Sequence, residues 1–301
     1  MQIEAYAKVN LTLEVLGTRP DGYHDLRSVV ALVDVADSIS LKEADEMSCR
    51  MSSEGGSSFN IDMSSMGAME DNLAVKAARF MQGLSGYGWD LAISIVKRIP
   101  LGGGLGGGSA DAAAVILALE KMWHTGLESG VLAAKSAVVG SDVPALVLAG
   151  SLGSMVVMEG RGERVSPLKA ALPSPVWLVL ANPGVFSSTP RVFKECRVSR
   201  DAADMSVLER MERAVSAGDP AGIAAALQND LSQSAMDIYP EIARARDALM
   251  EEGALGAQVS GSGATVFAVA TSEADARSIE AGAIRRGFKA TAARLVSNMK
   301  G

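Results

Sequence analysis

The stretch from residue 102 to residue 108 contains six glycines in seven positions, and an alanine-rich segment follows it. A turn needs only one or two glycines, so this density indicates backbone that wraps closely around a bound group with its N–H groups directed inward. Pro100 ends a strand-like stretch just before the run, and the positions from Ser109 to Trp123 favour a helix. A helix N-terminus beside such a loop is an anion site, and we expect the anion to be a phosphate chain.

Length and charge narrow the class of protein. With 301 residues the chain is long enough for one large or two moderate domains with ample core. Its formal net charge of −7 argues against nucleic acid or an anionic membrane surface as a partner. A polyphosphate ligand therefore needs a local basic site, for which the candidates are Lys8, Lys97, Arg98, Arg161, Arg191 and Lys194.

Cysteine usage and hydropathy predict the compartment. Cys49 and Cys196 form no motif with each other or with the two histidines, which indicates a reducing compartment and no structural zinc. No apolar run approaches the roughly 18–20 residues that span a bilayer. Residues 1–15 alternate like a strand and carry Glu4 and Lys8, so they do not resemble a signal peptide. We expect a cytoplasmic protein with no membrane partner.

Apolar periodicity predicts an α+β fold. Alternating residues predict strands over 1–15 and 91–99, an apolar stretch covers 28–35, and a short strand starts at Asp37. The second half is expected to alternate further strands (176–181, 258–259, 265–270 and 290–295) with helices over 207–217, 220–229, 240–252 and 273–287. A proline-rich stretch lies between the halves, and there we divide the chain into domains 1–168 and 169–301.

The glycine run can be compared with three known phosphate-binding loops, and two of them are the P-loop and the dinucleotide-binding loop. The P-loop requires a lysine after its last glycine, and Ser109 stands there instead, so that interpretation fails. The dinucleotide fingerprint is met by Gly102, Gly104 and Gly107, with Glu120 near the offset of a ribose-binding acid. A run this rich in glycine satisfies almost any glycine spacing by chance, however. A plain glycine linker is the remaining alternative, although linkers rarely lie tightly between a strand and a helix.

The segment from Pro100 to Ala113 resembles the phosphate loop of the GHMP kinase superfamily. Other segments resemble the same superfamily in the same order along nearly the whole chain, and the ordered set is far more specific than any one member. These segments are 7–11, 19–26, 71–73, 140–144, 159–163, 182–184, 188–193, 229–231, 239–242 and 260–264. The resemblance implies a two-domain α+β fold, in which the N-terminal domain is like domain 2 of ribosomal protein S5 and the C-terminal domain is a ferredoxin-like α/β sandwich.

The reaction that the resemblance implies is transfer of the γ-phosphoryl group of ATP to a hydroxyl, with Mg²⁺ neutralising the phosphates. No side chain is expected to form a metal site of its own. The residues expected to bind the phosphates are Pro100, Gly102, Gly103, Gly104, Gly106, Gly107, Gly108 and Ser109. Capping of the helix is an equally good role for the Ser109 hydroxyl.

The resemblance also supplies a catalytic pair. Asp142 is the candidate base for the acceptor hydroxyl, and Lys8 would keep that carboxylate ionised and polarise the hydroxyl. Without the resemblance, Lys8 reads as a solvated strand residue and Asp142 as a turn or cap residue.

The Asp-Gly-Tyr-His segment at 21–24 is similar to the branch of the superfamily whose small-molecule substrate is a methylerythritol linked to cytidine diphosphate. That likeness implies base stacking between Tyr23 and Phe193, hydrogen bonds from Asn10 and His24 to the base edge, and an approach by Thr189. The alternatives are another small-molecule kinase of the superfamily and a catalytically silent ligand-binding relative. We expect a monomer or a weak homodimer. Ala110 departs from the superfamily, which usually has a second serine there.

Overall fold

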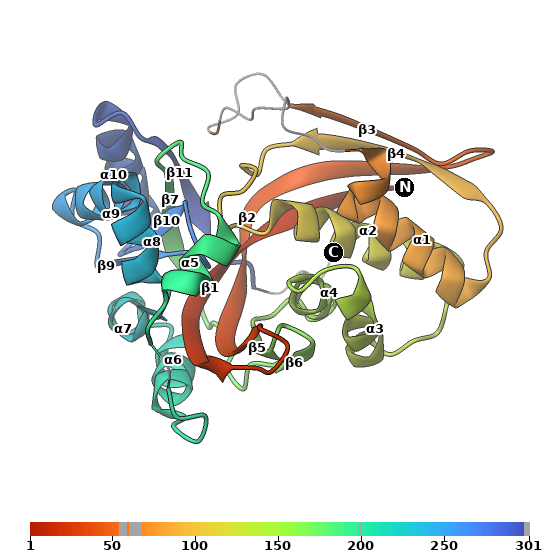
Figure 1. Ribbon diagram of the computed structural model, residues 1–301. Coiled ribbons are helices and arrows are strands. Elements are labelled where there is room, and N and C mark those ends of the chain that lie inside the picture. Colours follow the sequence, from red (N-terminus) through yellow and green to blue (C-terminus); the bar gives the residue numbers. More distant parts are fainter. Residues whose placement is uncertain (54–58, 60–67, 199, 298–301) are drawn as a thin grey trace.

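The computed structural model describes residues 1–53, 59, 68–198 and 200–297. Within these residues the chain forms two lobes, each built on a β-sheet with helices against it (Figure 1). The first sheet has seven strands and the second has four. This mixture confirms the α+β class predicted from the apolar periodicity.

Two long antiparallel strands form the spine of the molecule. Strand β1 (Gln2–Thr18) pairs with β2 (His24–Ala44) along almost its whole length. The sequence predicts that one strand ends and another begins near Asp37, but in the structure β2 continues through this position. The irregularity is a shift in the β1–β2 register between Tyr6 and Ala7. The polar Asp37 stays inside the strand because its fully buried carboxylate has partners, as shown below.

The remaining strands of the first sheet extend this spine on both sides. The sheet order is β3 (Ser48–Ser53), β4 (Asp90–Lys97), β2, β1 and β8 (Gln228–Asn229). On the side where its last part pairs with β4, the first part of β2 pairs with β5 (Val156–Gly160), which in turn pairs with β6 (Arg164–Pro167). The phosphate loop follows β4, so its entry is fixed by a strand in the interior of the sheet.

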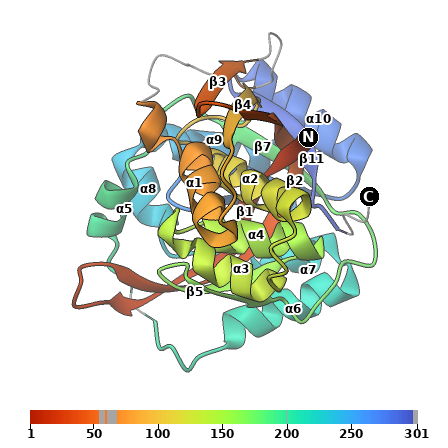
Figure 2. The same cartoon turned by 90° about the vertical axis from the view of Figure 1, so that its right-hand side faces the viewer.

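Helices cover one face of the first sheet (Figure 2). They are α1 (Leu73–Ser85), α2 (Gly107–Trp123), α3 (Ser129–Lys135) and α4 (Val143–Leu152), with short 3-10 turns η2 (Met69–Asp71) and η3 (Ser136–Val138). Asn72 caps α1 by accepting a hydrogen bond from the Ala74 N–H at 2.8 Å. Small alanine side chains let α2 lie close to β1, α1 and α4, so that most of its circumference is buried.

The second sheet is antiparallel in the order β11 (Lys289–Arg294), β7 (Trp177–Asn182), β10 (Val266–Ala270) and β9 (Gly256–Val259). Helices α9 (Pro240–Glu251) and α10 (Glu273–Arg285) contact its strands. The other helices of this half are α5 (Thr189–Glu195), α6 (Ser206–Ala217), α7 (Pro220–Ala226) and α8 (Ser232–Ile238). Helices α5 and α8 were not predicted from the sequence, and the helix predicted over 220–229 is too long, because residues 228 and 229 form β8.

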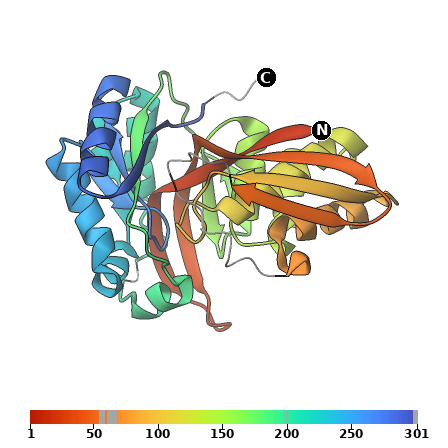
Figure 3. The ribbon, with the colours of Figure 1, turned by 90° about the horizontal axis from the view of Figure 1, so that it is seen from above.

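The two lobes share the spine strands. The end of β1 and the start of β2 reach the second lobe, as Figure 3 shows. Their residues Leu13, Val15 and Leu26 belong to the apolar core of that lobe. Sheet membership changes between Pro167 and Trp177, but β8 returns to the first sheet. The division at residue 168 stays a prediction. No helix among the described residues is both long enough and apolar enough to cross a membrane.

Candidate active site

The glycine run forms a loop that enters α2. Gly102, Gly104 and Gly106 have positive φ angles of 64°, 76° and 70°, which side chains larger than hydrogen disfavour. Helix α2 begins at Gly107, two residues earlier than predicted, and Gly106 is its N-cap. The capping role considered for Ser109 is therefore wrong. The N–H groups of the first turn have no partner within the helix and can bind an anion.

Carbonyl groups of the loop are held by both lobes. The Lys8 N–H on β1 donates to the Leu105 carbonyl at 3.0 Å. From the second lobe, the Thr265 N–H donates to the Gly103 carbonyl at 3.0 Å, and the Ser260 hydroxyl donates to the Gly104 carbonyl at 2.9 Å. These three bonds fix the loop while its helix-proximal N–H groups remain available.

Close contacts explain why particular positions are glycine. A Cβ atom on Gly104 would lie 2.2 Å from the Ser260 carbonyl oxygen, and one on Gly103 would lie 2.9 Å from the Thr265 hydroxyl. A Cβ on Gly106 would lie 3.1 Å from the Lys8 side chain. Gly108 differs, because the nearest atom to its added Cβ would be 3.7 Å away. The run therefore contains both glycines that the fold requires and one that it does not.

Lys8 and Asp142 lie next to each other, as predicted. The Lys8 ammonium lies 3.5 Å from a carboxylate oxygen of Asp142, and the Lys8 residue is only 5% exposed. Asp142 is the N-cap residue of α4, yet its side chain makes no capping hydrogen bond. Lys8 therefore does not fit its alternative role as a solvated strand residue, whereas Asp142 occupies a turn and cap position without using its carboxylate as a cap. The pair is a buried ammonium beside a half-buried carboxylate at the end of the phosphate loop.

Asn10 lies beside this pair on β1. Its amide oxygen accepts a hydrogen bond from the Lys8 ammonium at 2.7 Å, and its amide nitrogen donates to the Ser28 hydroxyl at 2.8 Å. The two-residue spacing of Lys8 and Asn10 places both on one face of the strand. The amide of Asn10 is thus engaged with Lys8 and Ser28, and its predicted contact with the base edge stays a prediction.

The residues expected to bind the base come from opposite lobes. The rings of His24, at the start of β2, and Phe193, on α5, have centroids 5.1 Å apart. Tyr23 is 59% exposed, and the Arg161 guanidinium lies 5.1 Å from the centroid of its ring. The structure therefore brings His24 and Phe193 together and leaves Tyr23 beside them as an accessible aromatic surface.

Residues 260–263 form a second glycine-rich turn, for which the sequence alone predicts no role. Its Ser262 hydroxyl lies 2.7 Å from the Thr189 hydroxyl. A Cβ on Gly261 would lie 3.4 Å from the Lys8 ammonium. Asn229 anchors the turn by donating to the Val259 and Gly261 carbonyls at 2.8 and 2.7 Å. The repeated Ser-Gly spacing was the signal that could have identified this turn as part of the site.

Among the described residues, no group of three His, Cys, Asp or Glu side chains could hold a metal ion. Mg²⁺ commonly keeps several waters and binds through one or two carboxylates together with substrate phosphates.

Family models match both halves of the chain. The GHMP kinases N terminal domain matches residues 72–150, and the GHMP kinases C terminal domain matches residues 211–290. These matches and the phosphate loop define the protein as a kinase of the GHMP class, which confirms the predicted superfamily and its fold.

Similar proteins narrow the class further. A 4-diphosphocytidyl-2-C-methyl-D-erythritol kinase of Symbiobacterium thermophilum is 39% identical over 89% of this chain and 90% of its own length. A protein of the same name from Cereibacter sphaeroides is 42% identical over 91% of this chain and 90% of its own. The crystal structure of a 4-(cytidine 5'-diphospho)-2C-methyl-D-erythritol kinase has a TM-score of 0.78 and 31% identity, covering 99% of this chain and 100% of that one. The chain belongs to the 4-diphosphocytidyl-2-C-methyl-D-erythritol kinase family.

Proposed function

We propose that the protein transfers the γ-phosphoryl group of ATP to the 2-hydroxyl of 4-diphosphocytidyl-2-C-methyl-D-erythritol, a step of the non-mevalonate route to isoprenoid precursors. One observation carries the proposal. The Lys8–Asp142 pair, 3.5 Å apart, lies beside a preformed phosphate loop, and Lys8 is on β1, the spine strand that pairs with the strand of His24. A phosphate site, a hydroxyl-activating pair and a base platform are the three parts that this reaction needs.

The loop would bind the phosphates through backbone groups. The free N–H groups at the start of α2 and the helix dipole favour the negative charge of the β- and γ-phosphates. Because the loop is already held at Gly103, Gly104 and Leu105, it reorganises little when charge shifts during transfer. Mg²⁺ on the ATP phosphates adds further charge neutralisation.

Asp142 would take the proton from the acceptor hydroxyl as the oxygen attacks the γ-phosphorus. One O–P bond forms, the bond from the γ-phosphorus to the bridging oxygen breaks, and ADP leaves with that oxygen. The Lys8 ammonium lies 3.5 Å from the Asp142 carboxylate, and the orientation of the ammonium is set by its hydrogen bond to Asn10. The buried ammonium is also placed to offset charge on the transferring group.

Tyr23, His24 and Phe193 would select the cytidine end of the substrate. Stacking on a flat ring suits any base, so hydrogen bonds to the base edge from His24 and Asn10 must supply the preference for cytosine. Thr189 on α5 would approach the substrate from the second lobe, and its hydroxyl is positioned by the hydrogen bond with the Ser262 hydroxyl. We propose further that the protein works in the cytoplasm as a monomer or weak homodimer, with no nucleic acid or membrane partner.

A substrate panel tests the proposal directly. Purified protein with ATP and Mg²⁺ is given 4-diphosphocytidyl-2-C-methyl-D-erythritol, mevalonate, homoserine or a free sugar, and ADP release is measured. We expect ADP with the first substrate alone, and phosphorus NMR should place the new phosphate on the 2-oxygen. Release of ADP only with another acceptor would assign the protein to a different reaction of the class. Binding of substrate and ATP without turnover would favour the silent relative.

A further inference from the structure

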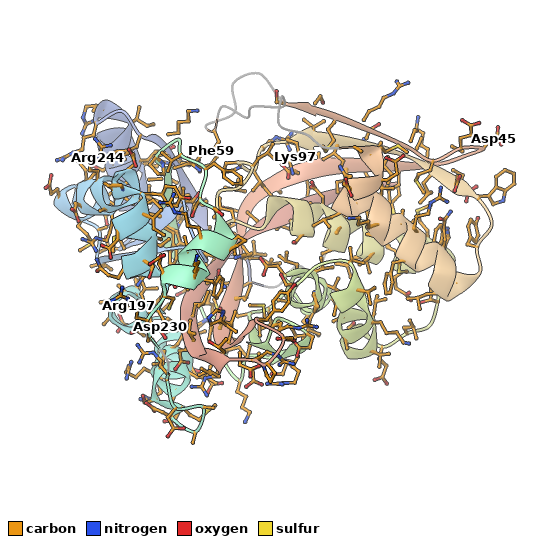
Figure 4. All side chains as sticks on the ribbon, viewed as in Figure 1. Asp45, Phe59, Lys97, Arg197, Asp230 and Arg244 are labelled. Carbon is orange, nitrogen blue, oxygen red and sulfur yellow. The ribbon has the colours of Figure 1, made fainter. Side chains whose placement is uncertain are left out.

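Three charged side chains are buried beneath the phosphate loop. Lys97, the last residue of β4, is 1% exposed, Asp37 on β2 is fully buried, and Asp111 on α2 is 3% exposed. Figure 4 labels Lys97 at the end of β4, beside the start of α2. From the sequence alone, Lys97 is a candidate phosphate ligand. Its ammonium is instead occupied by the two carboxylates, so it cannot serve as a free phosphate ligand.

Asp37 ties the beginning of the loop to the first sheet. One of its oxygens accepts hydrogen bonds from the backbone N–H groups of Arg98 and Ile99, the latter at 2.8 Å. Its other oxygen accepts from the Lys97 ammonium. The first two residues after β4 are therefore held by a carboxylate from the neighbouring strand.

Asp111 ties the other end of the loop to the same ammonium. The Lys97 nitrogen donates to one Asp111 oxygen at 2.7 Å. A Cβ atom on Gly107 would lie 3.5 Å from that nitrogen, so the ammonium lies directly under the first turn of α2. One buried cation thus joins the entry and the exit of the loop.

Stability alone does not account for this cluster. Buried ion pairs are often no more stabilising than apolar residues of similar volume, because desolvation offsets the attraction. The second oxygen of Asp111 has no hydrogen-bond partner among the described residues. Burial raises the pKa of Asp111 to about 7, even though Lys97 acts in the opposite direction. Apolar residues could fill this space, but they could not fix two backbone segments at defined atoms.

We propose that Asp37, Lys97 and Asp111 are positioning residues that hold the phosphate loop in its nucleotide-binding shape. The inference rests on the proposed function only in that the loop binds ATP. The cluster acts through the backbone of Arg98, Ile99 and the first turn of α2, and it does not touch the nucleotide. Its loss should weaken nucleotide binding by letting the N–H groups of the loop move.

The test compares substitutions at two residues of α2, Asp111 and Val115. Asp111→Ala removes the tie but leaves Lys97 paired with Asp37, so no buried charge is left alone. Val115→Ala is the control, since Val115 is fully buried on the same helix and has no bond to Lys97. Asp111→Asn keeps an oxygen that can accept from Lys97 and serves as the conservative variant. Asp111→Val fills the space without the tie and replaces Asp111→Ala if the latter does not fold.

Two measurements are made on each full-length variant: calorimetric binding of ADP, and amide hydrogen exchange of residues 98–109. We expect Asp111→Ala or Asp111→Val to raise the Kd of ADP about tenfold and to speed exchange in the loop, whereas Asp111→Asn stays within about twofold. Val115→Ala should lower Tm with no change in Kd or loop exchange. Equal effects of the alanine variants, or an unchanged Kd without Asp111, would overturn the proposal. Neither readout uses the acceptor, so failure of the substrate assignment is detected separately.

Discussion

The two ligand sides of the active site are built in opposite ways. On the nucleotide side the binding groups are backbone N–H groups, held by hydrogen bonds from both lobes and underlain by buried charges. On the base side they are side chains near the tip of the β1–β2 hairpin and on the short helix α5, with Tyr23 59% exposed. The nucleotide side is preorganised, and the base side can adjust to its ligand.

This difference predicts how mutations will act. Substitution on the nucleotide side must move backbone, so its effects should be large and should depend on the exact position. Substitution on the base side removes contact area without moving backbone, so its effects should be moderate and confined to one substrate. The catalytic pair lies between the two sides and belongs to neither.

The largest effect is expected at that junction. Asp142→Asn keeps the shape of the side chain but removes its capacity to take a proton. We expect kcat to fall by about 10²–10⁴-fold while the KM values of both substrates change little. Steady-state kinetics with each substrate varied in turn checks this. Near-normal turnover would remove Asp142 from the proton transfer.

The next effect distinguishes two glycines of the same loop. Gly104→Ala places a Cβ 2.2 Å from the Ser260 carbonyl at a φ of 76°, so backbone of one lobe must shift. We expect kcat/KM for ATP to fall about 100-fold or more. Gly108→Ala keeps the backbone N–H that is expected to bind phosphate, and its added Cβ would have no atom closer than 3.7 Å. Because the position is helical, activity should be kept and Tm should not fall. If both variants behaved alike, the loop would not be held by backbone contact.

The nucleotide side and the base side also differ in how well the sequence predicts them. The phosphate loop and the catalytic pair are recognisable because their chemistry lies in short local motifs, such as the glycine run and the Ala-Lys-Val-Asn segment at 7–10. The strands expected over 1–15 and 91–99 follow from alternating apolar residues for the same reason. Local signals suffice where the structure itself is local.

Features that depend on tertiary contact were not predictable in this way. Helix α5 has seven residues and only one of them, Val192, is buried, so no apolar period marks it. Strand β8 consists of two residues that follow a helix and pair with β1. Lys97 looks like a phosphate ligand until Asp37, 60 residues away, is placed against it. Residues 48–69 are rich in Ser and Met, and no role is predicted for them from the sequence. Of these, residues 54–58 and 60–67 lie outside the described part of the chain.

On the base side, Tyr23→Ala should raise the KM for the cytidine substrate about tenfold, since stacking of a base on an aromatic ring contributes about 1–3 kcal/mol. The KM for ATP should stay unchanged, because Tyr23 lies in the turn between β1 and β2 and its ring packs against Arg161. Trp89→Ala is the matched control: Trp89 is also an exposed aromatic residue, at 54%, but it lies just before β4 at the end away from the loop. A similar change in both KM values would place Tyr23 outside the base site.

The smallest expected effect is a pH dependence of stability on the nucleotide side. The pKa of Asp111 is raised from 3.8 to about 7, chiefly by burial, so the folded protein binds this proton more tightly than the unfolded chain. Its contribution to stability is therefore fully present below the unfolded pKa near 4 and is lost as the pH rises through about 7. The charge of Lys97 persists over this range, because the two carboxylates outweigh the effect of burial and raise its pKa.

Asp111→Asn removes the titration but keeps the hydrogen bond from Lys97. Between about pH 5 and about pH 8, the Tm of the parent protein should fall relative to that of Asp111→Asn by about 3 °C. Glu14→Gln provides the comparison, since Glu14 is a buried partner of Arg27 near the base side. If the parent and Asp111→Asn keep a constant Tm difference across this range, Asp111 is ionised throughout. The cluster would then hold the loop with a net negative charge beneath the phosphates, which would weaken the contrast between a preorganised nucleotide side and an adjustable base side.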